Sequence, residues 1–300
     1  MLRVASSVLI VCALTARLTL AQQPAQPPPI EQLYKMPVVY SVAGMDKAQI
    51  RHDIVYKSAQ TDKGKVDLKF DSYAPANSAP GKTYPTVVLI SGGGVEGAPY
   101  DWRDAGVYQS YGRILAASGF VAVAFSKRYA RGTTHGMEDT RDLVAYLREH
   151  AADLHVDQDR FAYWAFSAGG GVLASILGDS SLTTRAVLCF YCIAEADASG
   201  LSPEEADKNR RSFSSVYQVQ QASHALPALL VARAGLDSPA LNAGIDSLVA
   251  AALAKNLSIE VLNHPTGRHG FDILDPNDRS REIIRHAIDF LNAHVASSQP

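Results

Sequence analysis

The pattern of hydrophobic and polar positions divides the chain into two kinds of strand. In Ile50–Ser58 and Val66–Tyr73, apolar and polar residues alternate, which is typical of strands with one face in water. The turn-like cluster Thr61–Gly64 joins these segments and predicts an antiparallel hairpin. Continuous apolar runs follow, and they indicate strands buried on both faces of a parallel sheet: Thr86–Ile90, Phe120–Phe125, Phe161–Phe166, Ala186–Ile193, Ala228–Ala232 and Ile259–Leu262.

Helical periodicity separates several of these runs. It marks Asp139–His150, a segment that opens at the capping residue Ser238, and a last helix that begins near Ser280. Strands that alternate with helices predict an α/β fold: a mostly parallel central sheet, the hairpin at its N-terminal end, and helices on both faces. The polar segment 195–226 interrupts the alternation, and we expect a structured excursion there that acts as a lid.

The N-terminal segment has the composition of an export signal. Residues 1–21 contain Arg3, the apolar run Val8–Leu14 and a small residue, Ala21, at the predicted cleavage site. We therefore expect a periplasmic or secreted protein, and no stable membrane span, because the apolar run is short. Residues 22–37 are rich in Pro and Gln and are expected to be a tether without fixed structure. Residues 38–300 then form a single domain.

Charge and cysteine content exclude several functions. Loss of residues 1–21 removes Arg3 and Arg17 but no acid, so the formal net charge falls from −2 to −4, unlike that of a nucleic-acid-binding protein. Cys189 and Cys192 form an isolated C-x-x-C, which we interpret as buried thiols. With no zinc-binding motif in the sequence, we expect neither a metal nor a cofactor.

The candidate chemistry centres on Ser167. The segment Ala165-Phe-Ser-Ala-Gly169 follows a buried strand and matches the G-x-S-x-G nucleophile elbow, except that alanine replaces the first glycine. The alternative is an ordinary serine in a helix-capping turn. A serine nucleophile also needs a base and an acid, in the chain order Ser, acid, His.

Two later loops contain suitable partners. His269 lies between Gly267 and Gly270 after the last strand, which favours it over His264 as the base. Asp237 follows another buried strand and is our candidate acid, although its alternative role is a charge at a helix N-terminus. The amides of Gly92, Gly93 and Ala168 are candidates for the oxyanion hole.

A dinucleotide site is the competing interpretation of the glycine loop. Gly92-x-Gly94-x-x-Gly97 fits the fingerprint formally, and Ser126-Lys-Arg128 would suit a 2′-phosphate. Pro99, however, falls where the helix of the fingerprint should run, and no acid stands about 20 residues further on. The fingerprint would also leave the elbow at Ser167 unexplained, so we favour hydrolysis.

These segments resemble the α/β-hydrolase superfamily, in particular serine esterases related to dienelactone hydrolase and the esterase/lipase group with an H-G-G-G loop. The resemblance covers about residues 66–295 and depends on four segments: Ser91-Gly-Gly-Gly94, Ala165-Phe-Ser-Ala-Gly169, Gly235-Leu-Asp237 and His269-Gly-Phe271. It implies an α/β-hydrolase fold, with Ser167 as nucleophile, Asp237 as acid and His269 as base. Ser91 replaces the histidine of the loop, and serine replaces the cysteine nucleophile of dienelactone hydrolases proper.

The sequence thus predicts a serine carboxylesterase for small or medium acyl esters. A peptidase or amidase with the same triad is the alternative among enzymes, and a non-catalytic binding module on a hydrolase fold is the alternative of another class. Tyr100, Trp102 and Tyr217 either line the substrate pocket or anchor their loops. The acyl and alcohol groups and the oligomeric state are not predicted.

Overall fold

The computed structural model describes residues 28–61, 64–92, 100–128, 135–196 and 202–296. The predicted signal segment, residues 1–21, lies outside them. The eight strands are β1 (Gln49–Thr61), β2 (Gly64–Ala74), β3 (Tyr84–Ile90), β4 (Val121–Phe125), β5 (Val156–Phe166), β6 (Thr184–Phe190), β7 (Ala228–Ala234) and β8 (Ile259–His264). Each corresponds to a strand that the hydrophobic pattern predicts.

One mixed sheet contains all eight strands, in the order β1-β2-β4-β3-β5-β6-β7-β8. The pairs β1–β2 and β2–β4 are antiparallel, and every pair from β4–β3 onward is parallel. The predicted N-terminal hairpin on a parallel sheet is therefore confirmed. The parallel strands β3 to β7 are almost entirely buried because helices cover both of their faces.

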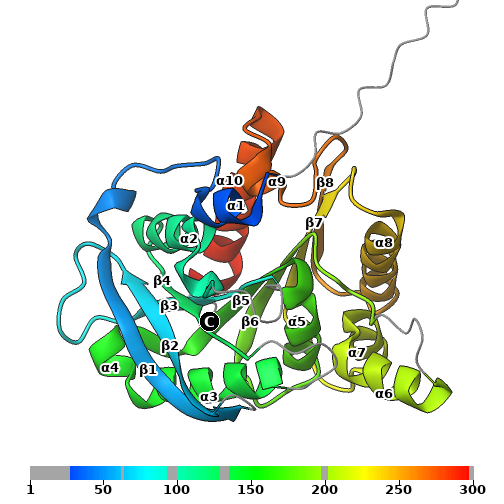
Figure 1. The fold of residues 1–300 in the computed structure, drawn as a ribbon, viewed down its shortest axis with the longest axis horizontal. Coiled ribbons are helices and arrows are strands. Elements are labelled where there is room, and N and C mark those ends of the chain that lie inside the picture. The colour runs from blue at the N-terminus through cyan, green and yellow to red at the C-terminus, as the bar shows by residue number, and fades with distance from the viewer. Residues whose placement is uncertain (1–27, 62–63, 93–99, 129–134, 197–201, 297–300) are drawn as a thin grey trace, which may run out of the picture.

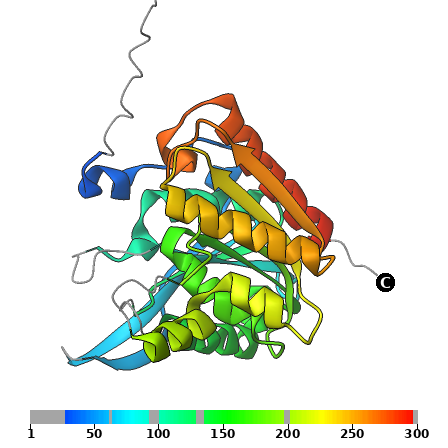
Figure 2. The same ribbon diagram turned by 90° about the vertical axis from the view of Figure 1, so that its right-hand side faces the viewer.

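The helices are α1 (Ile30–Lys35), α2 (Gly106–Ala117), α3 (His135–Glu149), α4 (Ala151–Leu154), α5 (Gly170–Leu177), α6 (Pro203–Phe213), α7 (Ser215–Gln221), α8 (Pro239–Ala254), α9 (Phe271–Leu274) and α10 (Asp278–Leu291). Short helical turns are η1 (Met45–Lys47), η2 (Trp102–Asp104), η3 (Ser167–Gly169) and η4 (Asn292–Ala296). Helices α3, α5, α7 and α8 cover one face of the sheet, and α2 and α10 cover the other (Figures 1 and 2).

The segment expected to be a tether is partly helical. Pro29 precedes helix α1, and the hydroxyl of Tyr34 donates to the carbonyl of Asp101 at 2.8 Å. The prediction from Pro and Gln content failed for residues 30–35 because that content does not reveal a docking partner 67 residues away.

The run Ala186–Ile193 also ends earlier than predicted. Strand β6 stops at Phe190 because Tyr191 adopts a left-handed conformation, with a φ of 41°. Cys189 and Cys192 therefore lie in the same layer of the core, although residues three apart on one strand would point to opposite faces. Both thiols are free and buried, as predicted, and that of Cys192 donates to the carbonyl of Ala165 at 3.2 Å.

Helix α2, which the pattern analysis did not predict, packs closely on the sheet at Gly112. A Cβ at this position would lie 2.5 Å from a ring carbon of Tyr73, which is fully buried. We predict that Gly112→Ala lowers the free energy of unfolding by about 1–3 kcal/mol through overpacking. Urea denaturation measures the change. Gly171→Ala is the control, because its Cβ would meet Phe213 at 3.5 Å, and equal losses in the two variants would contradict the packing argument.

Candidate active site

Ser167 stands at the sharp corner between β5 and α5. Its φ of 51° is left-handed, a strained conformation that costs about 1–3 kcal/mol in a residue other than glycine. Gly169 follows two residues later, and a Cβ there would lie 2.6 Å from the carbonyl oxygen of Ile90. The corner therefore requires glycine at position 169. The left-handed conformation of Ser167 projects its hydroxyl beyond the end of the sheet.

His269 joins Ser167 to Asp237. Its Nε2 lies 2.8 Å from the Oγ of Ser167, and its Nδ1 lies 2.6 Å from an Oδ of Asp237. A carboxylate only accepts hydrogen bonds, so Nδ1 carries the proton and Nε2 accepts from the serine hydroxyl. The other Asp237 oxygen accepts from the amide of Ser238 at 2.8 Å. The Asp237 side chain is 6% exposed and that of His269 is 39% exposed, so the imidazole faces solvent while the carboxylate is protected.

The topology explains why these three residues meet. Ser167 directly follows β5, Asp237 lies in the turn after β7, and His269 lies in the loop after β8. Because β5, β7 and β8 run parallel in one sheet, their carboxyl ends share one edge. The structure thus brings together the three side chains that the sequence analysis selected.

His264, the alternative base, and the two acids that follow His269 have structural contacts. His264 is buried and lies 3.1 Å from the hydroxyl of Ser280. Asp275 pairs with Arg268 at 2.7 Å. Asp272, the other acid that follows His269, is buried against two tyrosines.

The prediction for the oxyanion hole needs a correction at Gly92. Its amide donates to the hydroxyl of Tyr108 on α2 at 2.9 Å, so it is already used inside the protein. Gly93 lies outside the described residues. Ala168 is the residue after Ser167 in turn η3, and its amide stays a candidate for the oxyanion hole.

Lys127 supports the start of the glycine loop. Its Nζ donates to the hydroxyl of Ser91 at 2.7 Å and to the carbonyl of Ser91 at 3.0 Å. A lysine from the end of β4 thus holds the residue that replaces the loop histidine of similar hydrolases. Burial lowers the pKa of Lys127 to about 8.

The same contacts remove the basis for a 2′-phosphate site. Lys127 is held by Ser91, Arg128 binds the buried carboxylate of Asp139 at 2.7 Å, and the hydroxyl of Ser126 donates to Asp101. Helix α2 begins only at Gly106, too late to be the helix of a dinucleotide fingerprint.

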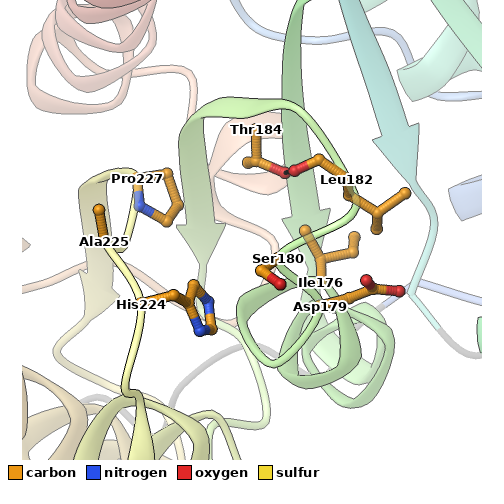
Figure 3. A pocket seen from close by; sticks show the side chains of 8 residues that line it. All are labelled: Ile176, Asp179, Ser180, Leu182, Thr184, His224, Ala225 and Pro227. Carbon is orange, nitrogen blue, oxygen red and sulfur yellow. Dashed lines mark hydrogen bonds between the residues drawn. The ribbon is translucent and has the colours of Figure 1, made fainter.

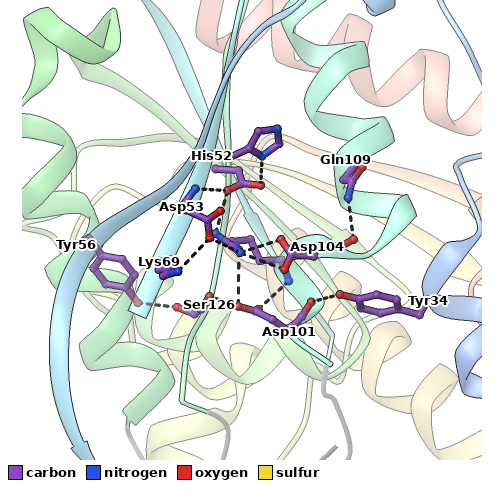
Figure 4. A network of polar contacts seen from close by, with 11 residues as sticks. Tyr34, His52, Asp53, Tyr56, Lys69, Asp101, Asp104, Gln109 and Ser126 are labelled. Atoms are coloured by element: carbon purple, nitrogen blue, oxygen red, sulfur yellow. Dashed lines mark hydrogen bonds and ion pairs between the residues drawn. The ribbon is translucent and has the colours of Figure 1, made fainter. Parts of the chain in front are cut away.

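A second polar network joins Asp53, Asp101 and Asp104 (Figure 4), and Arg103 lies at its centre. This buried guanidinium pairs with the carboxylates of Asp71, Asp53 and Asp104 at 2.9–3.1 Å. Burial alone would lower the pKa of Arg103, but the carboxylates of Asp71, Asp104 and Asp101 raise it above its ordinary value. The network connects the β1–β2 hairpin to turn η2, and it was not predicted because its members are distant in the sequence.

The predicted pocket aromatics have partners within the fold. The ring of Tyr100 lies 4.8 Å from that of Tyr34 on α1, and Trp102 lies 6.0 Å from the same ring. Tyr217 lies under the guanidinium of Arg210 at 4.6 Å, within the excursion. These contacts favour the anchoring alternative for Tyr100 and Trp102.

A cavity of about 260 Å³ lies at the C-terminal end of α5 (Figure 3). It is lined by Ile176, near the end of that helix, by Thr184, the first residue of β6, and by Pro227, just before β7. The amino ends of the strands are opposite to Ser167, so this cavity is separate from the candidate site. Its one histidine, His224, lies 3.1 Å from the carbonyl of Leu177.

Among the described residues, no helix is long and apolar enough to cross a bilayer. The same part of the chain contains no group of three or more His, Cys, Asp or Glu side chains suited to a metal ion.

The topology and the solved structures described below show that the chain has an α/β-hydrolase fold, as the resemblance seen in the sequence implied. The sequence model of the family BD-FAE matches residues 70–215. A secreted lipase of Arthroderma benhamiae is 27% identical over 141 residues, or 41% of this chain. That match spans only 28% of the length of the lipase.

Solved structures of esterase 2 from the planctomycete Thermogutta terrifontis share the fold. The native form has a TM-score of 0.66 at 20% identity, covering 85% of this chain and 96% of the other. A propionate-bound form has a TM-score of 0.67 at 20% identity, covering 85% and 98%. A form phosphorylated by paraoxon has a TM-score of 0.64 at 21% identity, covering 83% and 95%.

Lys127 provides a test of the loop support. The unfolded chain binds the lysine proton up to its ordinary pKa of 10.5, whereas the folded chain releases it near pH 8. The free energy of unfolding should therefore rise between about pH 8 and 10.5 relative to Lys127→Met, which has no such proton. Urea denaturation of both proteins across this range measures the difference. Parallel pH curves would contradict a desolvated amine.

Proposed function

We propose that the chain is a serine carboxylesterase that hydrolyses small or medium acyl esters through an acyl-enzyme. The observation that carries this proposal is the unbroken hydrogen-bond chain from Ser167 through His269 to Asp237. Each contact has the length and direction that proton transfer from a serine hydroxyl requires.

In the proposed mechanism, the Oγ of Ser167 attacks the ester carbonyl while Nε2 of His269 takes its proton. Asp237 holds the imidazole in the productive tautomer and stabilises the imidazolium. His269 then returns the proton to the leaving alcohol, and a water molecule releases the acid by the same route. The amides of Ala168 and Gly93 are our candidates for binding the oxyanion, where losing one such donor typically costs about 2.7–4 kcal/mol.

The comparisons support ester substrates. Among the solved structures with this fold are forms of the Thermogutta esterase bound to butyrate and propionate, and forms modified by paraoxon, sarin and tabun. Organophosphates of this kind react with activated serine nucleophiles. The bound butyrate and propionate support the choice of short acyl groups in this proposal.

A peptidase or amidase with the same triad is the alternative among enzymes. Rates on p-nitrophenyl esters of increasing acyl length and on peptide anilides distinguish the two activities. A folded protein that is inert toward both panels would favour a binding module.

Removal of the nucleophile should abolish turnover. We expect Ser167→Ala to lower kcat on p-nitrophenyl butyrate by a factor on the order of 10⁴–10⁶, and Asp237→Asn by about 10⁴. His286→Ala is the matched control, because this histidine pairs with Glu260 on the far surface and should retain activity. A fluorophosphonate adduct that maps to another residue, or no adduct on the folded wild type, would refute the mechanism.

We also propose that residues 1–21 are a signal that is removed during export. The mature protein is then expected in the periplasm or medium with Gln22 as its first residue. Fractionation followed by mass spectrometry of the N-terminal peptide checks this, and a chain that retains Met1 in the cytoplasm would contradict it.

A further inference from the structure

A second carboxylate lies buried beside the proposed catalytic base. Asp272 is on α9, three residues after His269, and its side chain is fully buried. One oxygen accepts from the hydroxyl of Tyr191 at 2.6 Å, and the other accepts from the hydroxyl of Tyr111 at 2.8 Å. Because both oxygens act as acceptors, the contacts fit an ionised carboxylate.

Tyr191 connects this carboxylate to the imidazole. Its ring centroid lies 4.8 Å from that of His269, while its hydroxyl is held by Asp272. The backbone of Tyr191 is left-handed, like that of Ser167, and the two residues directly follow the neighbouring strands β6 and β5. An aromatic residue rarely adopts this conformation, so the surrounding structure imposes it at the site.

Several polar and titratable groups face His269 and Asp272. His269 is faced by Asp237 from the β7–α8 turn, by Ser167 and by Tyr191. Asp272 is faced by Tyr191, by Tyr111 and Tyr108 of α2, and by the imidazole of His269. Burial raises the pKa of Asp272, while the two hydroxyls, and His269 when it is protonated, oppose that shift.

We propose that Asp272 and Tyr191 are positioning residues for His269. Asp272 fixes the hydroxyl of Tyr191 so that the aromatic ring holds the plane of the imidazole. Its negative charge also favours the imidazolium that forms when the proton of Ser167 moves to Nε2, and Asp272 itself takes no proton. This inference rests on the proposed function and adds a second carboxylate to the triad.

The partner tyrosine on the other side of Asp272 offers a matched comparison. Tyr111 donates the same kind of hydrogen bond to the same carboxylate, but its ring packs on Trp164 and Phe166 in the core. Removal of the Tyr111 hydroxyl therefore takes one hydrogen bond from Asp272 without loosening Tyr191, the residue that touches the imidazole.

The test compares Asp272→Asn, Tyr191→Phe and Tyr111→Phe in the full chain on p-nitrophenyl butyrate. We expect Asp272→Asn to lower kcat by about 10–100-fold with KM within about twofold. The acidic limb of the kcat/KM profile should move to lower pH by about half a unit or more, because the imidazolium loses a stabilising charge. Tyr191→Phe should lower kcat more than Tyr111→Phe.

Two results would overturn the inference. One is an Asp272→Asn protein that is folded by circular dichroism and has a pH profile superimposable on that of the wild type. The other is an equal loss of kcat in the two tyrosine variants, which indicates a role in stability alone and remains measurable if Asp272→Asn does not fold. A wild type that neither hydrolyses esters nor labels at Ser167 contradicts the proposed function instead.

Discussion

The contact between the β5–α5 corner and the end of β3 is the constraint on which the site depends. Gly169 approaches the carbonyl of Ile90 so closely that a side chain would not fit, and Gly170 approaches the carbonyl of Ile193 in the same way. This packing fixes the first turn of α5 between the end of β3 and the loop after β6. The strained Ser167 is held there, because the burial of strands on both faces outweighs the cost of one left-handed residue.

The parallel sheet and the order of the candidate triad were predictable from the sequence. Continuous apolar runs mark strands buried on both faces, and loops after parallel strands meet at one edge. The sequence therefore predicts that three distant side chains meet. The signals are small residues around Ser167, glycines around His269 and a strand before Asp237. These features are local in the sequence. They predict the structure correctly where local preferences agree with the packing of the whole fold.

Contacts made by long-range partners were not predictable. The sequence made the amide of Gly92 a candidate donor to the oxyanion. In the structure this amide donates to the hydroxyl of Tyr108 on α2 instead. The sequence left open whether Tyr100 and Trp102 line a pocket or anchor their loop. Their contacts with Tyr34 of α1 favour anchoring. Asp272 followed His269 out of the expected order, so its burial against Tyr111 and Tyr191 left no trace in the pattern. In each case the deciding partner comes from a different element.

Helix α1 gives the N-terminal region a mechanical role. Tyr34 donates to the carbonyl of Asp101, and Arg103 nearby pairs with carboxylates of the hairpin. Helix α1 therefore supports the segment that follows the glycine loop. An affinity tag or a truncation that displaces this helix would act on the catalytic edge of the sheet. Protein engineers who work on this chain therefore have a reason to place fusions elsewhere.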